Sequence, residues 1–529
     1  MKVILALLAV CILRTVVLSQ APNLQWQKCY GGGNSDDAWS VLSTSDGGYI
    51  FFGNTWSSNG QVTNYHGGSD FWVVKADNIG NLIWEKCFGG SDDEYATSAM
   101  EVENGNIILA GLTHSNDLDV NGNHGLSDGW VVKLNASGNL INQRCFGGSS
   151  YDGFNFGSKV IGGGYIFVGG TTSINGDVTG IHSPANLGDI WVVRVDTSLN
   201  IQIQKCIGGS SYESASYIQE TTDHGYFIAG YPNSTDGDII TLSHGAKDYW
   251  ICKLDSMANI SWQMEFGGSS DDEIRCSKQT RDGGYVLAGS SLSNDGDVSG
   301  NHSSLGIFDY WIVKIDSTGS MQWQKCFGGS AIDDAFSVDT TLDGGIIVAG
   351  ESTSDDGDIT NSVSVNGANW WVIKTDLNGN LLWDKSLGGS NDEEAQSLCS
   401  TSDGGSIILG YTSSNDIDVT GNHGSGDYWA VKLSPDPVNI NLLNENNLSL
   451  TTYFDHDSKF LHYKIDSKSN YLGKLQVLDM LGNMILEYPI SVKIGNNVSQ
   501  LRIENYMEGV YFLRLVSENG IISRRLIID

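Results

Sequence analysis

Short segments that concentrate apolar and aromatic residues recur along most of the chain, separated by turns rich in Gly, Asp and Ser. One stretch contains four of them in succession: Glu273–Lys278, Tyr285–Ala288, Tyr310–Asp316 and Met321–Phe327. Branched aliphatic and aromatic residues at these intervals predict β-strands, and the Gly/Asp turns favour antiparallel pairing. No sustained helical period is present. The pattern therefore predicts an all-β chain.

This four-strand pattern occurs seven times. A Gly-Gly pair follows each fourth strand, and an Asp or Asn two residues before a Trp opens each third strand. The pairs begin at Gly31, Gly89, Gly147, Gly208, Gly267, Gly328 and Gly388, and the tryptophans are Trp72, Trp130, Trp191, Trp250, Trp311, Trp371 and Trp429. Such a repeat predicts a seven-bladed β-propeller with four-stranded blades, and a parallel β-solenoid is the alternative. We expect the tryptophans to pack between blades.

The ends of the repeat predict how the ring closes. Leu24–Tyr30 matches a fourth strand, whereas the last copy contains only three, Gln396–Thr401, Ser406–Tyr411 and Tyr428–Leu433. We expect the N-terminal strand to complete the last blade, because that pairing covers an open sheet edge. The propeller is then expected over residues 20–433, a linker over 434–447 and a small β-sandwich over 448–529.

Residues 1–19 predict a secretory signal peptide. Lys2 precedes the apolar run Val3–Leu13, and Val17 and Ser19 suit the small-residue positions before a cleavage site. A membrane anchor is the alternative, but Arg14 leaves the apolar run short of a comfortable span. No other segment approaches transmembrane length, so we expect a soluble or surface-attached protein.

The net charge of −33 lies wholly between residues 20 and 435. This acidic balance argues against a nucleic-acid partner, which needs a basic face. Many of the acids fall in the second-to-third-strand loops and in the connections between blades, which share one face of a propeller. We expect that face to be strongly negative, with contributions from Asp36-Asp37, Asp92-Asp93-Glu94, Asp271-Asp272-Glu273, Asp333-Asp334 and Asp392-Glu393-Glu394.

Two interpretations of the loop acids stay open. Oxygen-rich, Gly-containing turns suit Ca²⁺, the one cofactor that the sequence suggests. The alternative is Asx-turn chemistry, in which each Asp bonds local backbone amides. The candidate calcium ligands are Asp119, Asp177, Asp238, Asp297, Asp358 and Asp418. The loops lack the Glu at position twelve that an EF-hand loop carries.

The short turns on the opposite face resemble the aspartate box of propellers, as in Thr280 to Gly284, and we interpret them as turn devices. Six loop histidines also recur, and the sixth copy lacks one. Equivalent positions on neighbouring blades are too far apart to share a metal, so we expect these histidines to pack the loops. They are His66, His124, His182, His244, His302 and His423.

The cysteines predict free thiols. Five occupy the same place in the fourth strands of different blades, where the distance between strands excludes a disulfide. No CxxC motif is present, so zinc and redox interpretations are weak. The five are Cys29, Cys87, Cys145, Cys206 and Cys326.

No GxSxG, HExxH, P-loop or dinucleotide-binding motif is present. The propeller region contains only four arginines, and no pair of carboxylates stands out among the repeated acids. Near-equivalent blades favour a binding role. The alternative is a glycan-active hydrolase or lyase with carboxylates at the propeller axis. Clustered, non-repeated carboxylates at that axis would favour the enzyme.

The C-terminal region carries a different β pattern. Leu475–Gly482 is a strand with a Val-x-Asp-x-x-Gly turn, Met507–Leu515 contains Glu-Gly-Val-Tyr, and a basic pair precedes the end. These features resemble the C-terminal sorting domain of type IX secretion cargo, although the usual Pro-Asn-Pro opening is absent. The motif residues are Gly482, Gly509, Tyr511, Arg524 and Arg525.

The repeats over residues 24–433 resemble the Asp-Gly-Gly-Tyr/Trp-Val-Val-Lys propellers of such cargo. The two resemblances imply a bacterial protein that the type IX machinery exports, with release or anchoring at the outer cell surface. Removal of the sorting domain on export is also compatible with them. The leading hypothesis is a binding or adhesion module whose acidic loop face takes a polysaccharide or a surface protein.

Overall fold

The structure is a computed structural model. It describes residues 19–182, 187–240, 245, 247–302, 306–363, 367–436, 448–455, 459–468, 470–478, 484–502, 509–517 and 520–528. The chain divides into two compact units, Met1–Asp436 and Pro437–Asp529. The predicted signal peptide, apart from Ser19, and residues 437–447 of the predicted linker lie outside the described residues. Among the described residues, no helix has the length and apolarity needed to cross a membrane.

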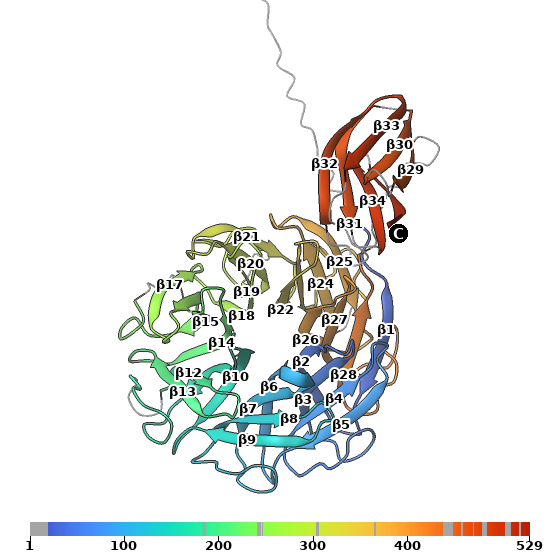
Figure 1. The fold of residues 1–529 in the computed structure, drawn as a ribbon. Helices are drawn as coiled ribbons and strands as arrows, with labels where there is room; N and C mark the ends of the chain where they lie inside the picture. Colours follow the sequence, from blue (N-terminus) through green and yellow to red (C-terminus); the bar gives the residue numbers. More distant parts are fainter. Residues whose placement is uncertain are drawn as a thin grey trace, which may run out of the picture. The chain divides into compact units, whose positions relative to one another are not determined.

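The first unit consists of seven four-stranded antiparallel sheets set around a common axis (Figure 1), which confirms the seven-bladed propeller. Blades one to three contain β2 (Asp36–Ser43), β3 (Tyr49–Thr55), β4 (Asp70–Ala76) and β5 (Leu82–Phe88); β6 (Glu94–Glu101), β7 (Ile107–Thr113), β8 (Asp128–Leu134) and β9 (Leu140–Phe146); and β10 (Asp152–Lys159), β11 (Tyr165–Thr171), β12 (Asp189–Val195) and β13 (Ile201–Ile207).

Blades four to six continue with β14 (Glu213–Glu220), β15 (Tyr226–Pro232), β16 (Tyr249–Leu254) and β17 (Ile260–Phe266); β18 (Asp272–Gln279), β19 (Tyr285–Ser291), β20 (Asp309–Ile315) and β21 (Met321–Phe327); and β22 (Asp333–Thr340), β23 (Ile346–Ser352), β24 (Asn369–Thr375) and β25 (Leu381–Leu387). The seventh blade contains β26 (Glu393–Ser400), β27 (Ser406–Thr412), β28 (Asp427–Leu433) and β1 (Leu24–Tyr30).

The N-terminal strand closes the ring, as predicted. β1 pairs with β28 in antiparallel register from Leu24 opposite Leu433 to Tyr30 opposite Tyr428. The chain then stays attached beyond the last strand. Asp436 accepts a hydrogen bond of 2.9 Å from the Trp383 indole and forms an ion pair with Lys374. The first residues of the predicted linker are therefore held by the propeller.

Burial between blades explains the repeated tryptophans, all seven of which are fully buried. Trp191, for example, belongs to a core shared with Ile108 and Val131 of the preceding blade, as predicted. Its indole N–H donates to Gln204 Oε1 at 3.1 Å, on the neighbouring fourth strand. A buried indole thereby keeps its hydrogen bond while its rings fill the space between sheets.

In the aspartate-box turns, the Asp carboxylate bonds a backbone amide of the turn and the ammonium group of a nearby Lys. In the first blade, Asp46 accepts hydrogen bonds from the Gly48 amide at 3.0 Å and from the Lys75 ammonium at 2.7 Å. The same pair recurs as Asp223–Lys253, Asp282–Lys314, Asp343–Lys374 and Asp403–Lys432. The second blade has a short 3-10 turn over Glu103–Gly105 at this place instead.

The second unit consists of two antiparallel sheets. One contains β29 (Leu448–Asp455), β30 (Phe460–Ser467) and β33 (Gly495–Arg502), and the other contains β31 (Tyr471–Leu478), β32 (Met484–Val492), β34 (Gly509–Ser517) and β35 (Gly520–Ile528). Leu450, Leu461 and Ile465 of the first sheet pack in one core with Val477 and Leu513 of the second. Two sheets over a shared core form the predicted β-sandwich.

Substituting Asp223 by Asn tests the aspartate-box pair. Partial burial raises the pKa of Asp223, but hydrogen bonds from Thr221 and Lys253 prevail and lower it to about 2. The stabilisation is thus present above the unfolded-state pKa and lost as the pH falls towards 2. We expect a loss of about 1 kcal/mol at pH 7, since solvent screens the exposed carboxylate.

Urea unfolding at pH 7, 4 and 2.5 checks this expectation. The difference between the two proteins should shrink as the pH falls. The control is Glu103→Gln, an exposed acid in the turn of the second blade, which should leave stability unchanged. A difference that persists undiminished at pH 2.5 would contradict the ion pair.

Candidate ligand-binding site

The acidic runs between blades split into buried and accessible acids. The first residue of each first strand is buried: Asp36, Glu94, Asp152, Glu213, Asp272, Asp333 and Glu393. Asp272 is typical, since it accepts hydrogen bonds from the Gly268 amide at 2.7 Å and the Ser293 hydroxyl at 3.1 Å. The expectation that the predicted runs add their charge to one face is wrong for the five of these acids that belong to them, Asp36, Glu94, Asp272, Asp333 and Glu393. They instead hold the Gly-Gly turn against the second-to-third-strand loop.

Glycine is required where the chain passes between two buried carboxylates. A Cβ added at Gly147 would lie 2.6 Å from Asp152 Oδ2 and 2.7 Å from Asp128 Oδ1. Carbon that close to an oxygen is a steric clash. The first Gly of each repeated pair therefore follows from the two polar side chains that flank the connection between blades, which are two carboxylates except at Gly388, where Asn369 replaces one of them.

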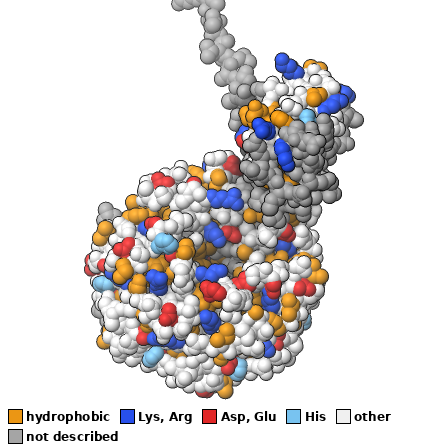
Figure 2. Space-filling view, in the orientation of Figure 1, with side chains coloured by type: hydrophobic (Ala, Val, Ile, Leu, Met, Phe, Trp, Pro, Cys, Tyr) orange, Lys and Arg blue, Asp and Glu red, His pale blue; other side chains and the backbone are white. Residues whose placement is uncertain are grey.

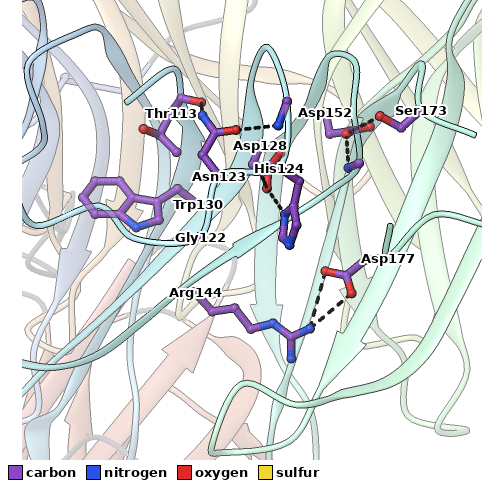
Figure 3. A network of polar contacts seen from close by, with 12 residues as sticks. Thr113, Gly122, Asn123, His124, Asp128, Trp130, Arg144, Asp152, Ser173 and Asp177 are labelled. Carbon is purple, nitrogen blue, oxygen red and sulfur yellow. Dashed lines mark hydrogen bonds and ion pairs between the residues drawn. The ribbon is translucent and has the colours of Figure 1, made fainter. Parts of the chain in front are cut away.

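The structure places the predicted calcium ligands one to a blade. Asp119, Asp238 and Asp358 lie 3.8, 3.5 and 3.6 Å from the Nε2 atom of a histidine on the preceding blade. Asp177 forms an ion pair of 3.3 Å with Arg144 (Figure 3). The other two, Asp297 and Asp418, accept long hydrogen bonds of 3.4 Å from the first Gly of the pair.

Among the described residues, no group of three or more His, Cys, Asp or Glu is placed to hold a metal ion. Calcium binding by the six aspartates stays a prediction. The acid two residues earlier in the loop bonds a backbone amide of the connection between blades, 26 positions away along the chain, and not a local amide as in an Asx turn. Asp295 Oδ1, for instance, accepts a hydrogen bond of 2.7 Å from the Ser269 amide.

The loop histidines have a specific partner that the sequence argument missed. His124 Nδ1 lies 2.5 Å from Oδ2 of buried Asp128, and the backbone amide of His124 donates to the same oxygen (Figure 3). The same pair recurs in the described part of four other blades, as His66–Asp70, His182–Asp189, His302–Asp309 and His423–Asp427. His244 lies outside the described residues.

A signal for this pair was available in the sequence. The sixth copy lacks the loop histidine, and the same copy carries Asn369 where the others carry Asp. A buried carboxylate without a cation is costly, whereas a neutral amide is less so. The two changes therefore belong together, and the histidine secures the loop to the third strand.

The first strands lie innermost in the ring (Figure 1), so their exposed side chains face the axis. Their first and third residues are buried, while the second and fourth are partly or fully exposed. The second residues are Asp37, Tyr95, Gly153, Ser214, Glu273, Asp334 and Glu394. We call the end of the axis that these residues surround the axial mouth. The residue types at these seven equivalent positions differ from blade to blade.

One side of the axial mouth is a carboxylate wall, formed by Glu351, Asp392, Glu394 and Asp37. A cavity of about 260 Å³ on this side is lined by Asp37, Glu394 and the half-exposed Trp39. Burial, together with the nearby charges of Glu394, Asp334 and Asp392, raises the pKa of Glu351 to about 8. Burial also raises the pKa of Glu394 and Asp37. These acids therefore repel one another within a partly desolvated site.

The adjacent acids of the mouth are compensated. The Arg275 guanidinium lies 2.9 Å from Glu273 and 3.6 Å from Asp334. The Lys247 ammonium lies 2.5 Å from Glu273. Both cations form their ion pairs on blades five and six, and among the described residues no ion pair reaches the acids of the carboxylate wall. Arg275 also lowers the pKa of Glu351, but burial and the neighbouring acids outweigh that effect.

The opposite side is a tyrosine wall, formed by Tyr95, Tyr151 and Tyr212. Their exposed fractions are 40%, 56% and 43%. With His114 and Asn155 they line a cavity of about 320 Å³. Tyr151 and Tyr212 come from the connections that precede β10 and β14, where other blades carry Ser, Asp or Ile. The axial mouth therefore combines aromatic rings with neutral polar groups on one side and carboxylates on the other.

Figure 2 shows one face of the propeller, which is hollowed near the centre of the ring, with acidic and basic side chains around the hollow. Inside the ring, the edges of the first strands are capped by side chains of neighbouring blades. Thr97 Oγ1 donates to the Phe154 carbonyl at 3.1 Å, and Asn155 Nδ2 donates to the Ala215 carbonyl at 2.8 Å. These carbonyls already have hydrogen-bond partners.

The C-terminal unit matches a known family. Residues 460–529 match the model of the secretion system C-terminal sorting domain. This confirms the predicted sorting domain and implies export by the type IX machinery to the bacterial surface or the medium. Of the motif residues, Gly509 begins β34, Tyr511 is buried in the sandwich core, and Arg524 and Arg525 lie in β35. Gly482 lies outside the described residues.

The solved structures that this chain resembles have low sequence identity and modest TM-scores. The WD40 domain of Neurospora crassa Pan2 is 11% identical, with a TM-score of 0.42 over 76% of this chain and 90% of that one. Sqt1 from Chaetomium thermophilum is 9% identical, with a TM-score of 0.41 over 78% and 99% of the two chains. A puromycin hydrolase is 10% identical, with a TM-score of 0.40 over 85% and 62%. No curated protein matches the sequence.

The buried acids predict how stability depends on pH. Burial raises the pKa of Asp36 and Glu94 to about 7, and of Asp272 and Asp333 to about 6, from ordinary values of 3.8 for Asp and 4.5 for Glu. The folded protein thus binds more protons than the unfolded chain between pH 4 and 7. We expect the free energy of unfolding to increase as the pH falls from 8 to about 5.

Urea unfolding at pH 8, 7, 6 and 5 measures this effect. Asp36→Asn should flatten part of the dependence, because its amide no longer takes up a proton. Stability that decreases steadily from pH 8 to 5 would show that these carboxylates are ionised in the folded protein.

Proposed function

We propose that this exported protein is a bacterial adhesion module that binds a polysaccharide at the axial mouth of its propeller. The observation that carries the proposal is the break in the sevenfold repeat. Buried positions keep the same residue types from blade to blade, whereas the residues that face the mouth differ. Structural demands act equally on all blades, so this departure indicates a function.

The tyrosine wall supports a sugar ligand. Exposed aromatic rings offer flat apolar faces for sugar rings, and a few neutral polar groups can fix their orientation. Tyr95, Tyr151 and Tyr212 provide such faces on neighbouring blades, and Asn155 lies among them. A protein ligand that adds a strand is less favoured, because Thr97 and Asn155 already occupy the edge carbonyls.

A double substitution, Tyr151→Ala with Tyr212→Ala, tests the binding function. Each stacked ring contributes about 1 kcal/mol beyond its buried area, so we expect affinity to fall at least tenfold. The measurement is binding of the full chain to a panel of immobilised polysaccharides. Tyr488→Ala, which removes an exposed tyrosine of the second unit, is the matched control. Unchanged binding by the double variant, or no polysaccharide bound by the wild type, would refute the proposal.

A second candidate is glycoside hydrolysis at the same mouth, because its carboxylates are clustered and not repeated. Glu351, with a pKa of about 8, is protonated at neutral pH beside ionisable Glu394. An acid paired with a carboxylate is the arrangement that glycoside hydrolysis uses. For this candidate, Glu351→Gln should reduce the release of reducing ends at least a hundredfold. A wild type that releases no reducing ends from any bound polysaccharide excludes it.

A further inference from the structure

We infer that the polysaccharide bound at the axial mouth is cationic, namely a polymer of amino sugars with free, protonated amino groups. This inference rests on the proposed function and specifies its ligand. The tyrosine wall would stack the sugar rings, and the carboxylate wall would receive the ammonium groups.

The two walls are contiguous around the mouth. Asp37 and Tyr95 occupy the same position on the first strands of neighbouring blades, and those strands, β2 and β6, contact one another. The arc continues from Asp37 to Glu394 in one direction and from Tyr95 to Tyr151 in the other. One oligosaccharide can therefore reach both walls. The half-exposed Trp39 adds an aromatic face beside the carboxylates.

Charge determines which sugar polymer fits. The cations Arg275 and Lys247 contact Glu273 and Asp334, not the acids of the carboxylate wall. Polymers with uronate or sulfate groups would meet like charge there, which is unfavourable. A neutral polymer would leave the mutual repulsion of the wall unrelieved. An ammonium group relieves it and donates hydrogen bonds to carboxylate oxygens.

A basic peptide carries the same charge but suits the site less well. An extended peptide gains its affinity from backbone hydrogen bonds to a free strand edge. The carbonyls of Phe154 and Ala215 on the aromatic side, and of Ile274 on the blade beyond it, already accept hydrogen bonds from side chains of neighbouring blades. Sugar hydroxyls do not need that edge.

Binding assays with matched hexamers test the inference. The probes are the β-1,4-linked hexamer of glucosamine, its fully N-acetylated form, a galacturonate hexamer and hexalysine. We expect the glucosamine hexamer to bind the full chain at least tenfold more tightly than the acetylated form. Its affinity should fall as salt rises from 50 to 500 mM, because salt screens exposed charges. The galacturonate hexamer should bind weakest.

Two variants connect this preference to the carboxylate wall. Glu351→Gln with Glu394→Gln keeps side-chain shape and should reduce the preference for the glucosamine hexamer to less than threefold. Glu103→Gln, an exposed acid outside the mouth, should leave it unchanged.

The outcomes separate this inference from the proposed function. Equal affinity for the glucosamine and acetylated hexamers would overturn the cationic ligand and leave polysaccharide binding intact. A preference that persists in the double Gln variant would place the amino groups elsewhere and overturn the inference. Tight binding of hexalysine without binding of any sugar polymer would overturn both.

Discussion

The pairing of β1 with β28 closes the ring, and every blade depends on that closure. Each sheet buries apolar side chains on both faces, and only a neighbouring blade can cover each face. An open ring would expose the faces of its first and last blades to water. A strand from the start of the chain therefore completes the last sheet. The stability of each blade then depends on the two neighbouring blades that cover its faces.

Within that ring, buried polar groups set the geometry of the connections. Each connection carries an acid that binds a Gly amide, and it faces a second acid or amide from the preceding third strand. In five described blades a histidine binds that second carboxylate, and in the sixth blade Asn369 stands in its place. Low dielectric makes an unpaired charge expensive there, so a change at one position is accompanied by a change at its partner.

The axial mouth follows a different rule. Its side chains face solvent, and the packing between blades does not constrain their identity. Tyrosines occupy one arc and carboxylates another, while Arg275 and Lys247 form ion pairs with Glu273 and Asp334 between them. The residues around the mouth thus differ although the blades are alike. The tyrosines suit the apolar faces of a ligand, and the carboxylates suit its positive charge.

The sequence by itself determined the blade number, the closing strand, the tryptophan packing and the sorting domain. These features follow from spacing along the chain, because a repeated strand pattern permits few arrangements. Only the tertiary structure decided which of two adjacent acids is buried, such as Asp36 and Asp37, and that Tyr95, Tyr151 and Tyr212 share a cavity. Neighbouring residues of a strand point to opposite sides, and residues about 60 positions apart meet only when the ring closes. The chemistry of the mouth depends on such contacts, so no local pattern could reveal it.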